Sequence, residues 1–172
     1  MISLWTARDL DIVEALTCRV RLLSIDQIAR IWWSRAGSLR VIRRRLRRLA
    51  AAGLIHRTIA NVHPPLDVSR PLAQWKPGVD EPDSRQVASQ AKNRWQSAST
   101  PRELFFATKL AANLYGSTAG ALPELNHRDH DLLLGQVYAV YRTTRPEEAQ
   151  WWVGHDTLPK AVSYTHLTLP TN

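Results

Sequence analysis

The sequence contains a single cysteine, Cys18, among its 172 residues. Neither a disulfide framework nor a paired-cysteine metal site is therefore available to it. No apolar run approaches the length of a membrane span, and the first ten residues lack the basic and apolar regions of a signal peptide. Gly-rich phosphate loops and the common hydrolase motifs are missing as well. These absences predict a cytoplasmic protein that is not an enzyme and holds no cofactor.

Lysine is absent from residues 1–60, although this segment holds 12 arginines against 4 acids, a net charge of +8. Residues 61–172 hold 11 basic and 11 acidic residues, so all the excess charge lies in the first third. Such asymmetry indicates a polyanion-binding module followed by a neutral one. Arginine also makes bidentate phosphate and guanine contacts better than lysine does. A high-GC genome would enrich arginine too, so the arginine content alone does not establish that this segment binds a polyanion.

Three helices are predicted in the first 53 residues, and each begins with a capping residue. Thr6 is followed by Asp9 and Ser24 by Gln27, both at capping-box spacing, while Ser38 stands before the third helix. Gly53 is expected just beyond the end of that third helix. The predicted helices span residues 7–17, 25–33 and 38–52.

The third predicted helix carries six arginines between Arg40 and Arg48. At 100° per residue, one face holds Leu39, Ile42, Leu46 and Leu49. The opposite arc holds Arg40, Arg43, Arg44, Arg47 and Arg48. Arg44 lies at the centre of that arc, whereas Arg45 lies on its shoulder near the buried face. Self-repulsion on such a helix is tolerable if the charged side lies against phosphates.

A β-hairpin is predicted after Gly53. Residues 54–60 alternate in polarity and form the first strand, and residues 71–75 (PLAQW) form the returning strand. Three helices followed by a hairpin make a winged helix-turn-helix. We therefore predict an α+β protein whose DNA-binding domain spans residues 4–78.

The second half is predicted to be a mainly helical, incomplete domain. Residues 79–100 form a linker with a flanking helix, and residues 101–162 form the domain itself. It has helices over 101–114, with Pro101 at the first position, and over 127–143, with Asn126 as N-cap, before a buried strand AQWWVGH. The last ten residues, SYTHLTLPTN, resemble a translated adapter. We therefore expect 163–172 to be non-native and the natural protein to continue past Val162.

Four segments carry a resemblance to a known family: LWTARDLDIVEAL, RLLSIDQIARIWW, SLRVIRRRLRRLAAAGLIHR and LNHRDHDLLLGQVYAVY. They resemble the replication-relaxation family of bacterial plasmids and mobile elements, over about Leu4 to Gly154. The resemblance implies a winged helix that binds DNA. After the helix that corresponds to residues 127–143, which opens with His127, some members also resemble restriction-endonuclease-like folds. Here WWVGHD has His155 where an acid is expected, with Asp156 beside it.

These observations predict a protein that binds double-stranded DNA and acts in replication initiation or transcription regulation. The predicted contacts are Ser38, Arg40, Arg43, Arg44, Arg47 and Arg48 of the third helix, with Arg57 and His63 of the wing. His56 is a further candidate on the wing. Two alternatives stay open: a nuclease fragment positioned by its winged helix, and a module that binds an acidic protein.

Metal binding is not predicted. His127 and His130 have a helical spacing that suits a metal, but no third ligand accompanies them. Asp129, Asp131 and Asp156 would form a Mg²⁺ cluster only in the nuclease alternative. Otherwise they are acids at helix and strand ends. Because two adjacent tryptophans on a strand cannot face the same way, either Trp151 or Trp152 should be exposed, toward a missing domain or a homodimer partner.

Overall fold

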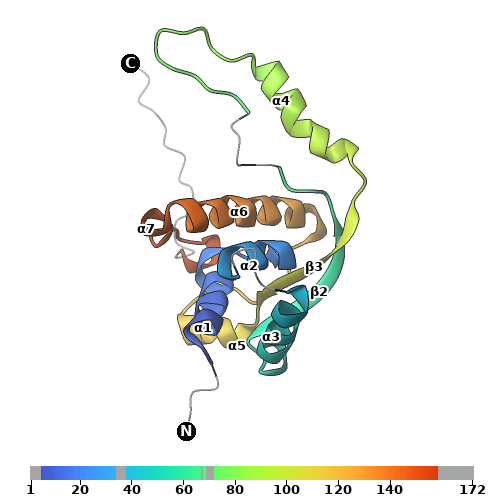
Figure 1. Ribbon diagram of the computed structural model, residues 1–172, viewed down its shortest axis with the longest axis vertical. Helices are drawn as coiled ribbons and strands as arrows, with labels where there is room; N and C mark the ends of the chain where they lie inside the picture. Colours follow the sequence, from blue (N-terminus) through green and yellow to red (C-terminus); the bar gives the residue numbers. More distant parts are fainter. Residues whose placement is uncertain (1–4, 34–37, 67, 69–71, 159–172) are drawn as a thin grey trace, which may run out of the picture.

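The computed structural model describes residues 5–33, 38–66, 68 and 72–158. Within these ranges the protein has an α+β fold with seven α-helices and a three-stranded antiparallel sheet (Figure 1). The helices are α1 (Ala7–Glu14), α2 (Ile25–Trp32), α3 (Leu39–Ala51), α4 (Ser84–Lys92), α5 (Lys109–Tyr115), α6 (Leu125–Thr144) and α7 (Pro146–Ala149). The strands are β1 (Leu23–Ser24), β2 (Ile55–Val62) and β3 (Thr100–Ala107). The expected α+β class is confirmed, and the adapter-like tail lies outside the described residues.

The three N-terminal helices form where their caps predict. Thr6 and Asp9 exchange capping-box hydrogen bonds at the start of α1, and Ser24 and Gln27 do the same at the start of α2. Each box satisfies backbone N–H groups that the first helical turn leaves without partners. A π-helical turn (Ala15–Arg19) continues α1. Gly53 has a φ of 72°, the left-handed conformation expected just past the end of α3.

The apolar face of α3 anchors it to the body of the protein. Ile42, Leu46 and Leu49 are fully buried in the main core with α1 and α2. Leu39, predicted to join them, is 41% exposed. The prediction was wrong there: Leu39 is the first residue of α3, at the end of the apolar face. The exposed start of α3 therefore offers apolar as well as charged surface.

The partner of β2 is not the strand predicted at 71–75. Residues 72–75 form no strand, and Pro71 lies outside the described residues. Instead β2 pairs along its whole length with β3, from Ile55 opposite Ala107 to Val62 opposite Thr100. Strand β1 pairs with the other edge of β3, so the order is β1-β3-β2. The sheet thus takes its central strand from a segment more than 37 residues beyond β2.

The helix predicted over 101–114 is also wrong in its first half. Residues Leu104 to Ala107 are all buried, as expected for a strand covered on both faces. Adjacent phenylalanines favour a strand, and Pro101 is tolerated close to the strand's start. Helix α5 begins only at Lys109, capped by the Thr108 hydroxyl, which accepts a hydrogen bond from the Ala111 N–H.

Helix α6 confirms the helix predicted over 127–143 but begins two residues earlier, with Glu124 rather than Asn126 as N-cap. The apolar spacing of the sequence predicts a buried stripe of Leu133, Leu134, Val137, Tyr138 and Tyr141, and the observed buried face differs from it. Tyr138 is buried, but Leu134 and Tyr141 are exposed, while Leu132 and Ala139 are buried in their place. The predicted strand AQWWVGH is absent: α7 leads into an irregular segment that ends in a short 3₁₀ turn. Helix α6 ends at Thr144, just before Pro146, and Pro146 begins α7.

Trp151 is 78% exposed and Trp152 is partly buried. One tryptophan of the pair is therefore exposed, as predicted, although the segment is not a strand. The Trp152 ring packs against Tyr138 and Tyr141 of α6, and its Nε1 donates to the Arg19 carbonyl oxygen.

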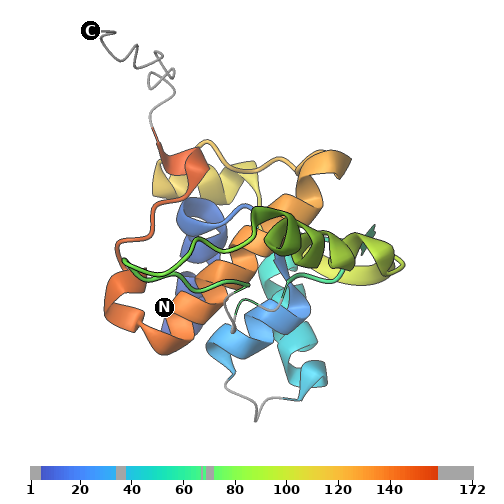
Figure 2. The same ribbon diagram turned by 90° about the horizontal axis from the view of Figure 1, so that it is seen from above.

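The sheet separates two packing layers. Ile55, Phe105 and Ala107 face α1, α2 and α3 in the main core. Leu104 and Phe106 face the other way, in a smaller cluster with Leu132 of α6. Helix α6 runs alongside α2 (Figure 1) and crosses the middle of the molecule when seen from above (Figure 2). Helix α4, on the β2–β3 connection, has no buried residue and stands away from this body (Figure 1).

None of the described helices is long and apolar enough to cross a membrane.

The Asp9 carboxylate, fully buried, joins α1 to α3. It accepts from the Thr6 N–H and hydroxyl, each at 2.7 Å, and from the Arg45 guanidinium. Burial acts to raise the pKa of Asp9, but these hydrogen bonds outweigh it and hold the pKa below its ordinary value.

We expect Asp9→Asn to lower the free energy of unfolding by about 3 kcal/mol at pH 7, because the Arg45 charge is left half-buried without its partner. Because the pKa of Asp9 is lower in the folded than in the unfolded state, its ionised form stabilises the fold above about pH 4. This stabilisation is lost as the pH falls through the folded-state pKa. The free energies of unfolding of the parent and of Asp9→Asn, measured by urea denaturation, should therefore converge at acid pH. Asp26→Asn, which breaks the exposed pair with Arg102, is the control and should change stability little. Equal losses of unfolding free energy in Asp9→Asn and Asp26→Asn would show that the Asp9–Arg45 pair contributes no more than a surface contact.

Candidate nucleic-acid interface

Helix α3 presents its arginines away from the core, as its sequence predicts. Arg40, Arg43, Arg44, Arg47 and Arg48 are exposed, on the side opposite the buried aliphatic residues. Arg45 differs: it is partly buried, with its Nε 2.5 Å from Asp9 Oδ1. The helical phase assigned from the sequence is therefore confirmed. Five of the six arginines lie on the free face, and the sixth is part of the fold.

The start of α3 adds a capped N-terminus to this face. The Ser38 hydroxyl accepts from the Arg40 N–H at 3.3 Å, and the side chain is exposed. The first N–H groups of a helix attract anions, since they carry partial positive charge. Ser38 thus lies at the same end of α3 as Arg40.

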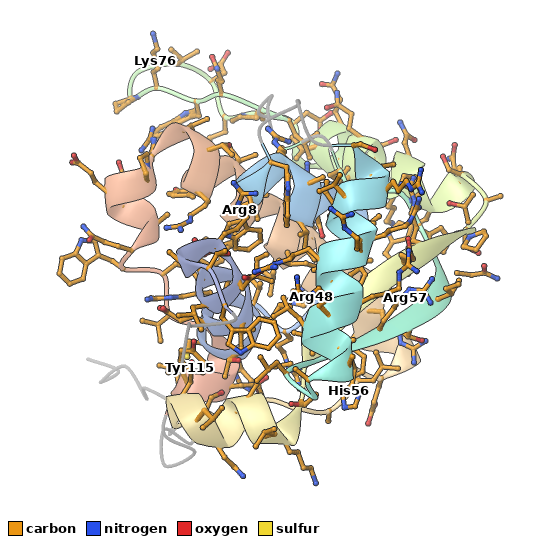
Figure 3. All side chains as sticks on the ribbon, turned by 60° about the horizontal axis from the view of Figure 1, so that its bottom comes forward. Arg8, Arg48, His56, Arg57, Lys76 and Tyr115 are labelled. Atoms are coloured by element: carbon orange, nitrogen blue, oxygen red, sulfur yellow. The ribbon has the colours of Figure 1, made fainter. Side chains whose placement is uncertain are left out.

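A pocket of about 750 Å³ lies between the start of α1 and α3. Its charged lining is Arg8 of α1 with Arg44, Arg45 and Arg48 of α3, and the acid among them, Asp9, is bonded to Arg45. The guanidinium carbon of Arg8 lies 4.8 Å from the centre of the Trp33 ring, a cation–π distance. In Figure 3, Arg48 lies between Arg8 and the strand residue Arg57. Arg8 extends the basic face onto α1, and it was missed because an isolated arginine near a helix start carries no sequence signal.

The other flank of α3 faces the sheet. Glu103 of β3 accepts a hydrogen bond from Arg43 of α3 and another from Arg57 of β2, each at 2.6 Å. Burial acts to raise the pKa of Glu103, but these two arginines outweigh it and hold the pKa below its ordinary value. The carboxylate is therefore ionised at neutral pH. Arg43 and Arg57, both predicted contacts, are brought together by an acid that no sequence pattern singled out.

The structure does not bring His63 to the α3 face. Its backbone N–H and its Nδ1 both lie 2.9 Å from the Asp129 carboxylate of α6, and its ring lies against Trp95. At about 3.3 Å per residue, His63 is about 20 Å along the chain from Arg57. His56 is exposed, with its ring 5.0 Å from that of Phe106. Because residues alternate along a strand, it points to the opposite face from Arg57.

The three acids considered for a metal do not converge. Asp129 pairs with His63. Asp131 and Asp156 instead pair with Arg21: Asp131 Oδ2 lies 3.9 Å from its Nη1, and Asp156 Oδ2 lies 3.0 Å from its Nε. His127, His130 and His155 line the same pocket of about 440 Å³ as Asp131. Across the described ranges, no three His, Cys, Asp or Glu side chains are placed to hold a metal ion.

Asp131 is nevertheless unusual. It is buried, and its Oδ2 has no hydrogen-bond partner. Burial raises the pKa of this carboxyl above its ordinary value, despite the nearby charges of Arg21, His130 and His127. A buried carboxylate that lacks a donor costs stability whenever it is ionised.

We expect Asp131→Asn to raise the free energy of unfolding at pH 7, since the amide removes the buried charge. The folded-state pKa is above the unfolded value, so ionisation destabilises the native protein as the pH rises from about 4 through the folded pKa. The advantage of the variant should therefore disappear below about pH 4. Urea denaturation at several pH values measures it, with the exposed Asp80→Asn as control. A variant less stable than the parent at pH 7 would mean that the Arg21 ion pair outweighs the burial.

No protein-family model matches this sequence, and comparisons with curated proteins and with solved structures give no match either.

Proposed function

We propose that this protein binds double-stranded DNA as a winged helix-turn-helix. In this assignment α2 and α3 are the helix-turn-helix, α3 is the recognition helix, and β2 with β3 forms the wing. The chain order α1-β1-α2-α3-β2-β3, with β3 between β1 and β2, supports the assignment. The wing differs from a simple hairpin, because the long connection that carries α4 joins its two strands.

The observation that carries the proposal is the exposed arginine face of α3. A helix of this diameter fits the major groove of B-DNA, where arginines reach guanine edges and phosphates. Val41 and Leu39 are also exposed on α3, at 43% and 41%, and such side chains suit thymine methyl groups. Arg8 on one side and Arg57 on the other widen the basic surface beyond the helix itself (Figure 3).

We further propose that the protein acts in replication initiation or transcription regulation, the roles that the resemblance to replication-relaxation proteins implies. DNA binding itself is inferred from α3 and does not depend on that resemblance. The alternative that α3 binds an acidic protein shares the same arginines, so it must be separated by experiment. No placement of acids in the described residues favours the nuclease alternative.

Binding to a mixed-sequence DNA duplex should weaken steeply with salt, because each phosphate contact releases a counterion. With about five contacts, a plot of log K against log salt concentration should have a slope of about −4.5. Fluorescence anisotropy measures it, with poly-glutamate as the competitor. Failure to bind the duplex even at low salt would rule out the proposal. Displacement of bound DNA by poly-glutamate at an equal charge concentration would favour an acidic protein as the partner.

Arg44→Ala should weaken DNA binding by about 1–3 kcal/mol if Arg44 reads a base edge, and by less if it contacts a phosphate alone. Its fold should remain intact, because alanine is favoured at an exposed helical position. Fluorescence anisotropy measures the DNA affinity, and thermal unfolding checks that the fold is intact. Arg85→Ala, at an exposed position of α4 away from α3, is the matched control and should leave affinity unchanged.

Arg45→Ala should behave in the opposite way to Arg44→Ala. It leaves Asp9 buried without its cation, so the fold should be destabilised, while Arg45 contributes less than Arg44 to DNA affinity in the folded protein. Equal losses of affinity in the two variants, measured where both are folded, would contradict the assigned phase of α3.

A further inference from the structure

The flank of α3 that faces β2 is a distinct part of the basic surface. If α3 enters the major groove and the wing reaches the adjacent minor groove, as proposed above, one DNA backbone must pass between them. The residues at that junction are Arg43 of α3 and Arg57 of β2, and both side chains are 44% exposed. They line a pocket of about 560 Å³ together with Ile59 and Glu103.

Glu103 joins the two arginines from beneath. Its side chain is only 10% exposed, and each of its oxygens accepts from one arginine Nε. Because the Nε atoms are used in this way, the terminal Nη groups of both guanidiniums remain for another acceptor. The carboxylate thereby fixes two flexible side chains from different elements in one arrangement before any ligand binds.

The charges at this junction match a phosphodiester. Arg43 and Arg57 carry two positive charges, and Glu103 carries one negative charge, which leaves a net charge of +1. Arg102, which lines the same pocket, is already paired with Asp26 at 2.7 Å. A phosphodiester carries a single negative charge, so one backbone phosphate would neutralise the junction.

We propose that Arg43 and Arg57 bind one backbone phosphate of the DNA between α3 and β2, and that Glu103 is their positioning residue. This inference rests on the proposed DNA binding and adds to it the place where one strand is held. Glu103 does not contact the phosphate. It acts by holding both guanidiniums in place, so that less side-chain freedom is lost when the DNA binds.

The test is Glu103→Asp, which keeps the negative charge but shortens the side chain by one methylene, so that the two hydrogen bonds cannot both be retained. We expect DNA affinity to fall about tenfold, the loss that follows from freeing two ordered side chains. The slope of log K against log salt should also become shallower by about 1, because one phosphate contact is lost. A purely structural role would change stability without changing this slope.

Glu148→Asp is the matched control, since it makes the same change at the exposed Arg145–Glu148 pair on α7. It should leave both affinity and slope unchanged. Arg57→Lys provides a second variant at an exposed position that keeps its charge, in case Glu103→Asp does not fold. Lysine lacks the Nε that Glu103 holds, so affinity should again fall and the slope become shallower.

The outcomes separate this inference from the proposed function. If the parent protein binds DNA but the folded Glu103→Asp variant matches it in affinity and slope, the positioning role is wrong and DNA binding stands. Tighter DNA binding by Glu103→Asp would also overturn the positioning role, because Glu103 would then compete with DNA for the two arginines. If Glu103→Asp does not fold, unchanged affinity and slope in Arg57→Lys would show that the positioning role is wrong. If the parent protein does not bind DNA, both conclusions fail together.

Discussion

The arrangement of the arginine face depends on one buried ion pair, that between Asp9 and Arg45. Asp9 is part of the capping box of α1, in which Thr6 is the N-cap, and at the same time it bonds the guanidinium of Arg45 on α3. Successive residues of a helix are 100° apart, so anchoring one charged residue toward α1 fixes the direction of every other residue on α3. Burial of Ile42, Leu46 and Leu49 sets the same rotation from the apolar side. Two independent constraints therefore agree on which side of α3 remains free.

Arginine occupies two kinds of position in this chain: some side chains are exposed on α3, where we propose that they bind DNA, and others bond groups within the fold. Several arginines act as internal connectors. Arg19 donates to the carbonyl oxygens of Gln150 and Trp152, and Arg142 bonds Asp11. These contacts hold the C-terminal segment and α6 against the α1 region. A count of all the arginines therefore overstates the exposed basic surface, and the exposed set on α3 is the part that we propose to contact DNA. The planar guanidinium, with several N–H donors, suits both kinds of position.

Local signals predicted the three N-terminal helices well. The caps of α1, α2 and α3 and the helical period of α3 act over three or four residues, and the structure confirms them. The error at β3 has a physical cause: a short apolar run such as Leu104 to Ala107 fits either a buried strand or a helix, and only its distant partner decides. Glu103 was missed for the same reason. Its contacts with Arg57 and Arg43 span 46 and 60 residues, and no local pattern reports them.

The central strand β3 is where these long-range constraints meet. Phe105 lies in the main core, and Glu103 lies two residues away on the same face of the strand, beneath the arginines of α3 and β2. Leu104, between them, packs on the opposite face with Leu132 of α6. A displacement of β3 would therefore disturb the core, the α6 layer and the arginine pair together. Arg43 and Arg57 consequently cannot act as independent contacts, because both share one carboxylate. Their effects on any bound anion should be coupled rather than additive, as holds for residues in one ion-pair network.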